Sequence, residues 1–548
     1  MSRYALGLDF GTESVRAVLV DLSTGLPGAA AVIAYPHGVI DQRLPGVETR
    51  LPPEWALQSS TDWLDTMEQA IRQVLAERRV DAACVIGVGI DFTSCTVLPT
   101  TADGTPLHVL AACRDEPHAW PKLWKHHAAQ RQADRVNALA TERGEPWLAR
   151  YGGRISSEWV IPKALEMLEE TPAVYAAAER IVEGADWVVW QLTGILVRNA
   201  CAAGYKATWH KSSGYPGPAF LADLHPGLAD LYTERVGGPV VAPGTPVGGL
   251  TAAWAERLGL APGTPVAAPI IDAHAAVLGG GVSRPGTLFI MMGTSSCHLL
   301  LAEREVLAEG VSGVVEDGIV PGLFAYEAGQ AAVGDIFAWF VRSSVPPSYH
   351  EEAARTARSL HEVLGERAAA LRPGESGLLA LDWWNGCRTP LVDAELSGVI
   401  LGYSLQTTPE AIYRALIEST AFGTRLIVET FAAAGLPIES IRVGGGLTRN
   451  ALAMEIYADV TGLPIEISAT DQASAIGAAI LAAVAGGGFA TVDEAVRALA
   501  QPPSHTVAPR SEHRAVYDGL YREYRRLVDR FGREPDSPLI RLRALRDR

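Results

Sequence analysis

The chain has 548 residues, too many for one hydrophobic core, so two large domains with a cleft between them are expected. Apolar residues make up 48% and charged residues 20%, which argues against a disordered or coiled-coil chain. The formal net charge of −16, without a basic block to offset it, argues against a surface that collects nucleic-acid phosphates. We therefore expect no nucleic acid partner.

The cysteines and the apolar segments predict the compartment. Six scattered cysteines show no C-x-x-C spacing, which favours a reducing compartment over a zinc site or a disulfide framework. Asp9 interrupts the apolar run at the N-terminus, so no signal peptide is expected. The uncharged stretch 472–492 is rich in alanine and broken by glycines, which favours a buried helix over a membrane span. We expect a soluble, cytoplasmic protein with no membrane partner, and a homodimer stays open.

Two similar hairpins are predicted, almost half a chain apart. Residues 4–21 and 287–302 each form two β-rich runs around a small polar turn. The turns are Gly11-Thr12-Glu13-Ser14 and Gly293-Thr294-Ser295-Ser296. The repetition indicates an internal duplication, with a boundary at the glycine- and proline-rich stretch 279–286. We predict an N-terminal domain over residues 1–284 and a C-terminal domain over 285–548.

Between and after the hairpins, the pattern predicts alternating strands and helices. Strand-like runs at 85–90 and 441–443 favour α/β units. Residues 116–167 lack strand patterning and predict a mostly helical insertion that covers the cleft side of the first domain, with LWKHHAAQ as an exposed basic helix. Residues 511–531 predict a helix that packs one face on the second domain. That face comprises Val516, Leu520, Tyr524, Leu527, Val528 and Phe531.

The two turns are suited to binding phosphate. Tight Gly-Thr/Ser turns present converging backbone N–H groups and hydroxyl donors. A single copy is most simply an ordinary hairpin, but two matching copies favour a shared phosphate role. Only the first has a carboxylate nearby, Asp9, two residues before Gly11. An aspartate there is suited to holding Mg²⁺ through its waters, and a structural turn aspartate is the alternative.

Residues 441–485 predict a nucleotide pocket. The order is a strand, the loop Gly444-Gly445-Gly446, a helix from about residue 449, a turn at 462, a short strand and a second helix after residue 471. Three glycines let the backbone approach a flat ligand, and Asn450 could hydrogen-bond ribose or base. The spacing fits neither G-x-G-x-x-G nor a P-loop, and a glycine-rich strand-to-helix turn is common by itself.

Phosphoryl transfer to an alcohol requires a group that accepts the proton of the attacking hydroxyl. Asp272, in the loop PIIDAHAAVLGGG close to the predicted boundary, is the candidate. The alternative is a helix N-cap without a catalytic role.

Taken together, DFGT, MGTSS, the Asp272 loop, GGGLTRN and the final YREYRRLVDRF helix resemble the FGGY carbohydrate kinases along nearly the whole chain. Within that family, six strings are similar to the L-ribulokinase branch rather than to xylulokinases or glycerol kinases. They are GIDFTSCTVLP, LWKHHAAQ, YKATWH, MGTSSCHLL, EAGQAAVGDIFAWF and LDWWNGCRTP. The resemblance implies an α/β fold of two actin-like (ribonuclease H-like) ATPase domains that close around a central cleft on ATP and Mg²⁺.

The resemblance also implies a reaction and its residues. Asp272 would take the proton of the sugar's 5-hydroxyl as it attacks the γ-phosphorus of ATP, giving L-ribulose 5-phosphate in L-arabinose catabolism. Sugar-binding positions would be Ser94, Lys206, Asp272 and Glu327, and the metal would lie at Asp9 and Asp272. ATP would contact Gly11, Thr12, Glu13, Ser14, Gly293, Thr294, Ser295, Gly444, Gly445, Gly446 and Asn450.

Two alternatives stay open. The nearest is a kinase of the same family for another ketose or polyol, because scaffold motifs identify ATP chemistry better than they identify sugar hydroxyls. The other is an actin-like ATP switch that acts on protein partners. The kinase is favoured over the switch, because Asp272, Lys206 and Glu327 supply a polar acceptor site that a switch does not need.

Overall fold

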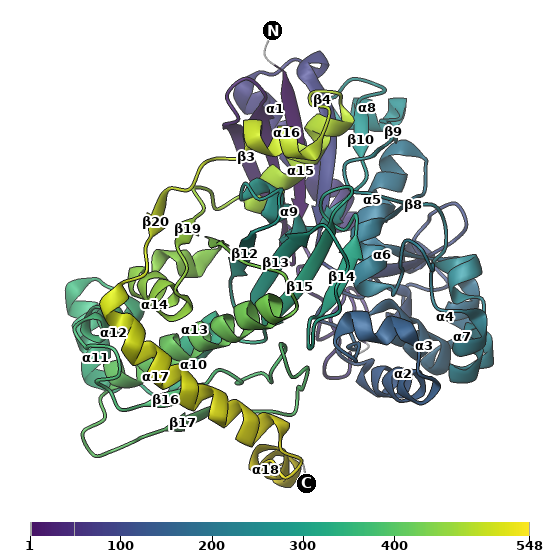
Figure 1. Cartoon of the computed structure of the whole chain (residues 1–548). Coiled ribbons are helices and arrows are strands. Elements are labelled where there is room, and N and C mark those ends of the chain that lie inside the picture. Colours follow the sequence, from purple (N-terminus) through teal and green to yellow (C-terminus); the bar gives the residue numbers. More distant parts are fainter. Residues whose placement is uncertain (1–2, 49, 547–548) are drawn as a thin grey trace.

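A seven-stranded sheet from the first half of the chain organises one side of the computed structural model, which describes residues 3–48 and 50–546 (Figure 1). Its strands are β1 (Tyr4–Phe10), β2 (Ser14–Asp21), β3 (Pro27–Ala34), β4 (Val85–Phe92), β9 (Pro246–Gly249), β10 (Pro265–Ala267) and β11 (Ile270–Ile271). Their order is β3-β2-β1-β4-β10-β9, with β11 beside β4. Because β1, β4 and β11 run parallel, their carboxyl ends meet at one edge.

A second seven-stranded sheet comes from the second half of the chain. Its strands are β12 (Thr287–Met292), β13 (Ser296–Ala302), β14 (Gly313–Glu316), β15 (Phe324–Gln330), β18 (Ser440–Gly444), β19 (Ile465–Ile467) and β20 (His505–Val507). Their order is β14-β15-β13-β12-β18-β19-β20. In both sheets the opening hairpin is antiparallel and its first strand pairs in parallel with a later one. Both predicted hairpins and the duplicated two-domain α/β fold are confirmed.

Helices cover both faces of the first sheet. α1 (Ser60–Arg78) packs on β2 and β3 through Trp63, Met67 and Ile71, which recur at helical spacing and are buried. On the other face lie α9 (Asp272–Gly279) and α15 (Ala473–Ala485). A Cβ on Gly7 of β1 would come within 1.9 Å of a carbonyl oxygen of α15, so this strand needs glycine for the helix to approach.

α15 confirms the buried helix predicted within 472–492, and it belongs to the second half of the chain. Figure 1 shows it, with α16 (Val492–Leu499), beside the purple strands of the first sheet. The chain therefore returns to the first sheet late in the sequence. The division at residues 284 and 285 stays a prediction.

The helical insertion lies between β4 and β9 and forms the blue region of Figure 1. Its helices are α2 (Gln130–Arg143), α3 (Val160–Glu170), α4 (Pro172–Ala177), α5 (Gly184–Thr193), α6 (Ala200–Lys206) and α7 (Pro218–Leu224), with short strands β5 (Val97–Thr100), β6 (Arg180–Glu183), β7 (Arg198–Asn199) and β8 (Val240–Val241).

The prediction of an exposed basic helix at residues 123–130 is wrong. That segment is mostly loop, and His126 is fully buried because its Nε2 lies 3.0 Å from the buried carboxylate of Glu166.

α8 (Ala252–Leu258) lies between β9 and β10 of the first sheet and contacts α1. The remaining elements belong to the second half of the chain. They are α10 (Gly334–Ser343), α11 (Pro347–Thr356), α12 (Leu360–Ala369), α13 (Pro409–Ala433), α14 (Ala451–Thr461), α17 (Ser511–Val528), α18 (Pro538–Arg546), β16 (Leu379–Leu381) and β17 (Val399–Leu401). Within the described ranges, none of the helices combines the length and apolar character that a bilayer crossing needs.

α17 confirms the predicted C-terminal helix, but the predicted buried face is partly wrong. Val516 is 43% exposed, and the buried side chains are those of Tyr517, Tyr521, Tyr524 and Val528. The tyrosines face inward because distant polar groups satisfy their hydroxyls. Tyr517 accepts from Arg414 at 3.0 Å, and Tyr524 donates to Asp382 at 2.9 Å.

Candidate active site

Three carboxylates gather at one edge of the first sheet. Asp9 and Asp91 are register partners near the ends of the parallel strands β1 and β4. β11 pairs with the end of β4, and Asp272 follows it as the first residue of α9. Asp91 was not predicted as a site residue, although a lone charge in the apolar run VIGVGIDF is a signal that could have identified it.

These carboxylates have little positive charge beside them. Burial raises the pKa of Asp9, and Arg16, with Nη1 3.2 Å from Oδ2, opposes that rise. Asp91 is fully buried, and no N–H or hydroxyl group of the described residues donates to its carboxylate oxygens. Burial, reinforced by the charges of Asp9 and Asp272 and by a hydrogen bond with Asp9, raises the pKa of Asp91 well above its ordinary value. The edge is therefore electrostatically suited to a bound cation.

The donor set fits Mg²⁺ as a hydrated ion. Magnesium prefers oxygen ligands and keeps much of its water shell. The described part of the chain has no group of three or more histidine, cysteine or acidic side chains placed to enclose a metal directly. Carboxylates that contact the ion through its waters need not converge so closely, and Asp9, whose side chain stays 15% exposed, can accept from such waters.

Asp272 has the properties of a general base. Its Oδ1 accepts a 2.7 Å hydrogen bond from the N–H of Ala273, while the backbone N-cap of α9 is Ile271. Burial, followed by the charge of Asp9, raises the pKa of Asp272 to about 7, although the Ala273 amide and Lys206 oppose the shift. A carboxylate with a pKa near neutrality can accept a proton from an alcohol more readily than an ordinary one.

Lys206 and Glu327 form a polar pair between the two halves of the chain. Lys206 ends α6 and Glu327 lies within β15, with 3.7 Å between Nζ and Oε1. Both residues are buried, at 5% and 3% exposure. Although burial raises it, the cations of Lys206 and Arg388 bring the pKa of Glu327 below its ordinary value, so this residue is an anion. The pair offers one donor and one acceptor beside Asp272.

Ser94 lies on the loop that follows β4, with a buried hydroxyl that has no partner in the described chain. The next residue, Cys95, has a φ of 49°, and its carbonyl accepts a 2.7 Å hydrogen bond from the buried Lys163. The insertion thus holds this loop through α3.

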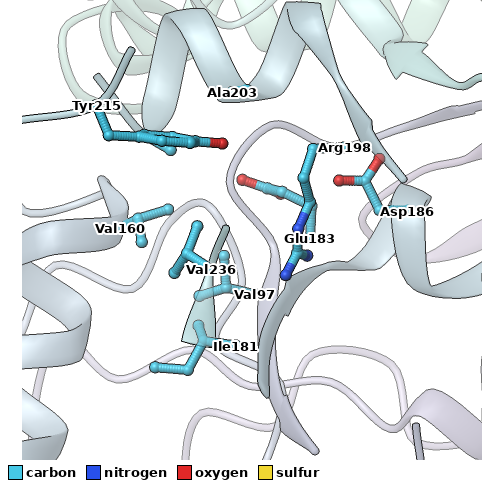
Figure 2. Close-up of a pocket in the computed structure, with 10 residues that line it drawn as sticks. Val97, Val160, Ile181, Glu183, Asp186, Arg198, Ala203, Tyr215 and Val236 are labelled. Atoms are coloured by element: carbon cyan, nitrogen blue, oxygen red, sulfur yellow. The ribbon is translucent and has the colours of Figure 1, made fainter. Parts of the chain in front are cut away.

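A small cavity lies in the insertion, between the strand after this loop and α6. Figure 2 shows Glu183, Asp186, Arg198 and Tyr215 among the residues around it. Its volume of about 20 Å³ suits a single water molecule and excludes a sugar. Burial raises the pKa of Glu183 to about 8, so this acid is mostly neutral at pH 7. This cavity is therefore not a substrate site.

A much larger cavity, of about 930 Å³, opens in the second domain. Four of the predicted ATP-contacting residues line it, namely Gly293, Thr294, Gly446 and Asn450. Its wall also includes Phe337, Tyr413 and Leu452, which offer apolar surface for a flat ring. Asn450 is the N-cap of α14, and its Oδ1 accepts from the Ala453 amide at 3.1 Å. The size and mixed lining suit a nucleotide.

The other predicted ATP contacts lie elsewhere. Gly444 ends β18, and Gly445 follows the strand and packs against the backbone of Met292. Ser295 closes the second turn by accepting from the Gly293 amide at 2.9 Å. In the first turn, Thr12 accepts from Gln58 at 2.7 Å and from Trp124 at 3.1 Å. The residues that do not line the large cavity are Gly11, Thr12, Glu13, Ser14, Ser295, Gly444 and Gly445, so their ATP role stays a prediction.

Two family models match the chain, one for each half. The N-terminal domain of the FGGY family of carbohydrate kinases matches residues 4–279, and the C-terminal domain matches residues 288–486. The chain therefore belongs to the FGGY family of carbohydrate kinases. Membership implies ATP and a sugar as substrates.

Individual relatives are similar along almost their whole length. A ribulokinase of Shouchella clausii is 51% identical, with 100% of this chain and 99% of the relative covered. A ribulokinase of Mycolicibacterium smegmatis is 49% identical, with 99% and 96% covered. Among solved structures, a xylulose kinase from Rhodospirillum rubrum has a TM-score of 0.79 at 25% identity, covering 96% of this chain and 98% of the other. A glycerol kinase of Plasmodium falciparum with ADP shares the fold, at a TM-score of 0.75 and 16% identity, with 96% and 98% covered.

Proposed function

We propose that this protein transfers the γ-phosphate of ATP to the 5-hydroxyl of L-ribulose, giving L-ribulose 5-phosphate and ADP. The observation that carries the proposal is the environment of Asp272. The pKa of this carboxyl is raised to about 7, and the charged residues that act on it are Asp9, Glu327 and Lys206. The named relatives, ribulokinases at about half identity, support ribulose as the sugar.

Each residue of the proposed site has its own role in the reaction. Asp272 takes the proton of the 5-hydroxyl while its oxygen attacks the γ-phosphorus and ADP leaves. Lys206 donates to a sugar oxygen, and Glu327 accepts from a sugar hydroxyl. The Ser94 loop closes the sugar site from the first domain. These directional contacts hold the hydroxyl in line with the phosphate, which is the main requirement of phosphoryl transfer.

Mg²⁺ would be held by Asp9 and Asp272 through its waters, with the buried Asp91 beside Asp9. When bound, the ion neutralises charge on the β- and γ-phosphates. The nucleotide would occupy the cavity lined by Gly293, Thr294, Gly446 and Asn450, and its phosphates would extend toward the first sheet. Closure of the two domains would exclude water and so limit wasteful ATP hydrolysis. We place the reaction in the cytoplasm, where the six free cysteines stay reduced.

A panel of sugars tests the assignment. Purified protein would be assayed with ATP and L-ribulose, D-ribulose, L-xylulose, D-xylulose or glycerol, and kcat/KM compared. We expect the largest value for L-ribulose and little ATP hydrolysis without sugar. A larger value for D-xylulose or glycerol would refute the substrate but preserve the reaction type. Brisk sugar-independent hydrolysis with no phosphorylated product would favour the ATP switch.

A further inference from the structure

Arg388 is a second cation on the Glu327 carboxylate. It lies on the loop between β16 and β17, and its Nη2 is 3.6 Å from Glu327 Oε1, the oxygen that Lys206 Nζ approaches to 3.7 Å. Both separations exceed the usual length of a hydrogen bond. The one hydrogen bond of its guanidinium in the described chain is a long contact of 3.9 Å from Nη1 to the sulfur of Cys297. Most of the guanidinium N–H donors therefore lack an oxygen acceptor.

The surrounding backbone holds Arg388 in this position. Thr389 donates its N–H to the Gly329 carbonyl at 3.2 Å, and its hydroxyl accepts from the Gly329 N–H at 3.2 Å and donates to the Gly310 carbonyl at 2.9 Å. Gly329 and Glu327 lie on the same face of β15, two residues apart. A Cβ on Gly329 would be only 3.1 Å from Nη1 and 3.2 Å from Cδ of Arg388. The absence of a side chain there leaves the room that the arginine fills.

The charge balance leaves Arg388 incompletely compensated. Although burial lowers it, the neighbouring Glu327 carboxylate raises the pKa of Arg388 above its usual value, so the residue is a permanent cation. Glu327 is the one carboxylate of the described chain that lies within 4 Å of both Lys206 and Arg388. About a third of the Arg388 side chain, 30%, remains exposed. A guanidinium in such a place favours a ligand with several oxygen acceptors.

The neighbours of Arg388 indicate which end of a sugar it would meet. Arg388 and Lys206 both approach Oε1 of Glu327, at 3.6 and 3.7 Å. Asp272 instead accepts from the Ala273 amide, and no salt bridge in the described chain joins it to Arg388. Arg388 therefore acts on the Glu327 side of the pocket rather than at the reacting hydroxyl.

We propose that Arg388 is a further sugar-binding residue, which donates two N–H groups to neighbouring oxygens of the sugar away from the hydroxyl that Asp272 deprotonates. The planar fork of arginine suits two adjacent oxygens, as a ketose offers in its carbonyl and the hydroxyl beside it. This inference rests on the proposed sugar-kinase function and adds a contact to the same site. The competing interpretation is a purely structural partner of Glu327.

Three variants separate these interpretations. Arg388→Gln removes the charge, Arg388→Lys keeps the charge without the fork, and Arg388→Ala leaves space for free guanidinium. Arg304→Gln is the matched control, because Arg304 is an exposed arginine that donates to the Gly435 carbonyl. Initial rates would give KM for sugar and for MgATP separately, using the sugar that the wild type turns over best. Thermal unfolding would report whether each variant is folded.

We expect KM for the sugar to rise about 10- to 100-fold in Arg388→Gln and Arg388→Lys, the loss typical of a charged hydrogen bond, with KM for MgATP unchanged. Millimolar guanidinium should restore part of the sugar affinity of Arg388→Ala. The control should behave as the wild type. An unchanged sugar KM in Arg388→Gln would overturn the proposal. So would full activity of Arg388→Lys, or equal losses for sugar and MgATP.

The outcome is distinguishable from failure of the proposed function. If the wild type prefers another ketose, the substrate assignment fails, yet the same variants test Arg388 with that ketose. If no sugar is turned over, calorimetric titration of L-ribulose into wild type and Arg388→Gln replaces the kinetics. Tighter binding by the wild type would then support the contact, and equal or absent binding would refute it.

Discussion

Asp9 and Asp91 lie opposite each other in the parallel register of β1 and β4, although only Asp9 has a cation, Arg16, within 3.2 Å. No N–H or hydroxyl group of the described residues donates to Asp91, and its hydrogen bond with Asp9 needs a proton held between the two acids. Two acids on adjacent strands repel each other when both are ionised. Ionising both acids is therefore unfavourable for stability unless a cation is present.

Replacing Asp91 by asparagine should change the stability of the protein and its Mg²⁺ requirement in opposite ways. We expect Asp91→Asn to be more stable without metal by about 1–3 kcal/mol, because an amide can donate to Asp9 without first binding a proton. The Mg²⁺ concentration for half-maximal rate should rise several-fold. Urea unfolding and Mg²⁺ titration of the rate measure the two effects, with the exposed Asp103→Asn as control. Lower stability and an unchanged Mg²⁺ requirement would contradict the interpretation.

Asp272→Asn should abolish turnover without loss of nucleotide binding. Asparagine keeps the size of the side chain and can still accept from the Ala273 amide, but it cannot take a proton. The expected fall in kcat is about 10²- to 10⁴-fold. Calorimetry with ATP should give a Kd close to that of the wild type. Turnover near the wild-type rate would remove Asp272 as the base.

The rate should depend on pH through Asp272. Burial raises the pKa of this acid from 3.8 to about 7, and only its ionised form accepts a proton. We therefore expect kcat/KM to fall about tenfold per unit as pH drops below 7, and to level off above it. Bound Mg²⁺ favours the carboxylate, so the profile of kcat should fall at a lower pH. A rate independent of pH between about 5.5 and 8 would oppose this assignment.

Glu327→Gln should weaken both the fold and sugar binding. The substitution leaves Lys206 and Arg388 near each other without their shared carboxylate. We expect a loss of about 3–5 kcal/mol in the free energy of unfolding, typical of a broken buried ion pair. The KM for sugar should rise with little change for MgATP. Glu48→Gln is a suitable control because that side chain is 96% exposed. If the Glu327→Gln variant were as stable as the wild type, Lys206 and Arg388 would not need Glu327 as a counter-ion in the fold.

The Asn450→Asp variant distinguishes two roles of Asn450, a contact to ATP and the N-cap of α14. The aspartate can still accept from the Ala453 amide, so the stability of α14 should be retained, whereas Asn450→Ala should lose about 1 kcal/mol. The added charge and the lost amide donor should weaken ATP binding about tenfold. Fluorescence titration with ATP and urea unfolding distinguish the effects. Unchanged ATP affinity in Asn450→Asp would place the nucleotide elsewhere.

The sequence by itself determined the elements whose signals are local. Alternating apolar residues around two Gly-Thr turns predicted both hairpins, and the strand, glycine loop and helix of 441–485 followed from adjacent residues. The FGGY motifs are also contiguous strings, so the family was identified without coordinates. Asp272, Lys206 and Glu327 were selected from such strings, and the structure places them within one network of charges.

Only the tertiary structure decided which polar side chains are buried and with what partners. Asp91 became a site residue because β4 lies beside β1, more than 80 residues away in sequence. Arg388 meets Glu327 because its loop is hydrogen-bonded to β15. The inward face of α17 depends on Arg414 and Asp382, which satisfy tyrosine hydroxyls. A polar group can be buried only where a distant segment compensates it, and one-dimensional periodicity does not contain that information.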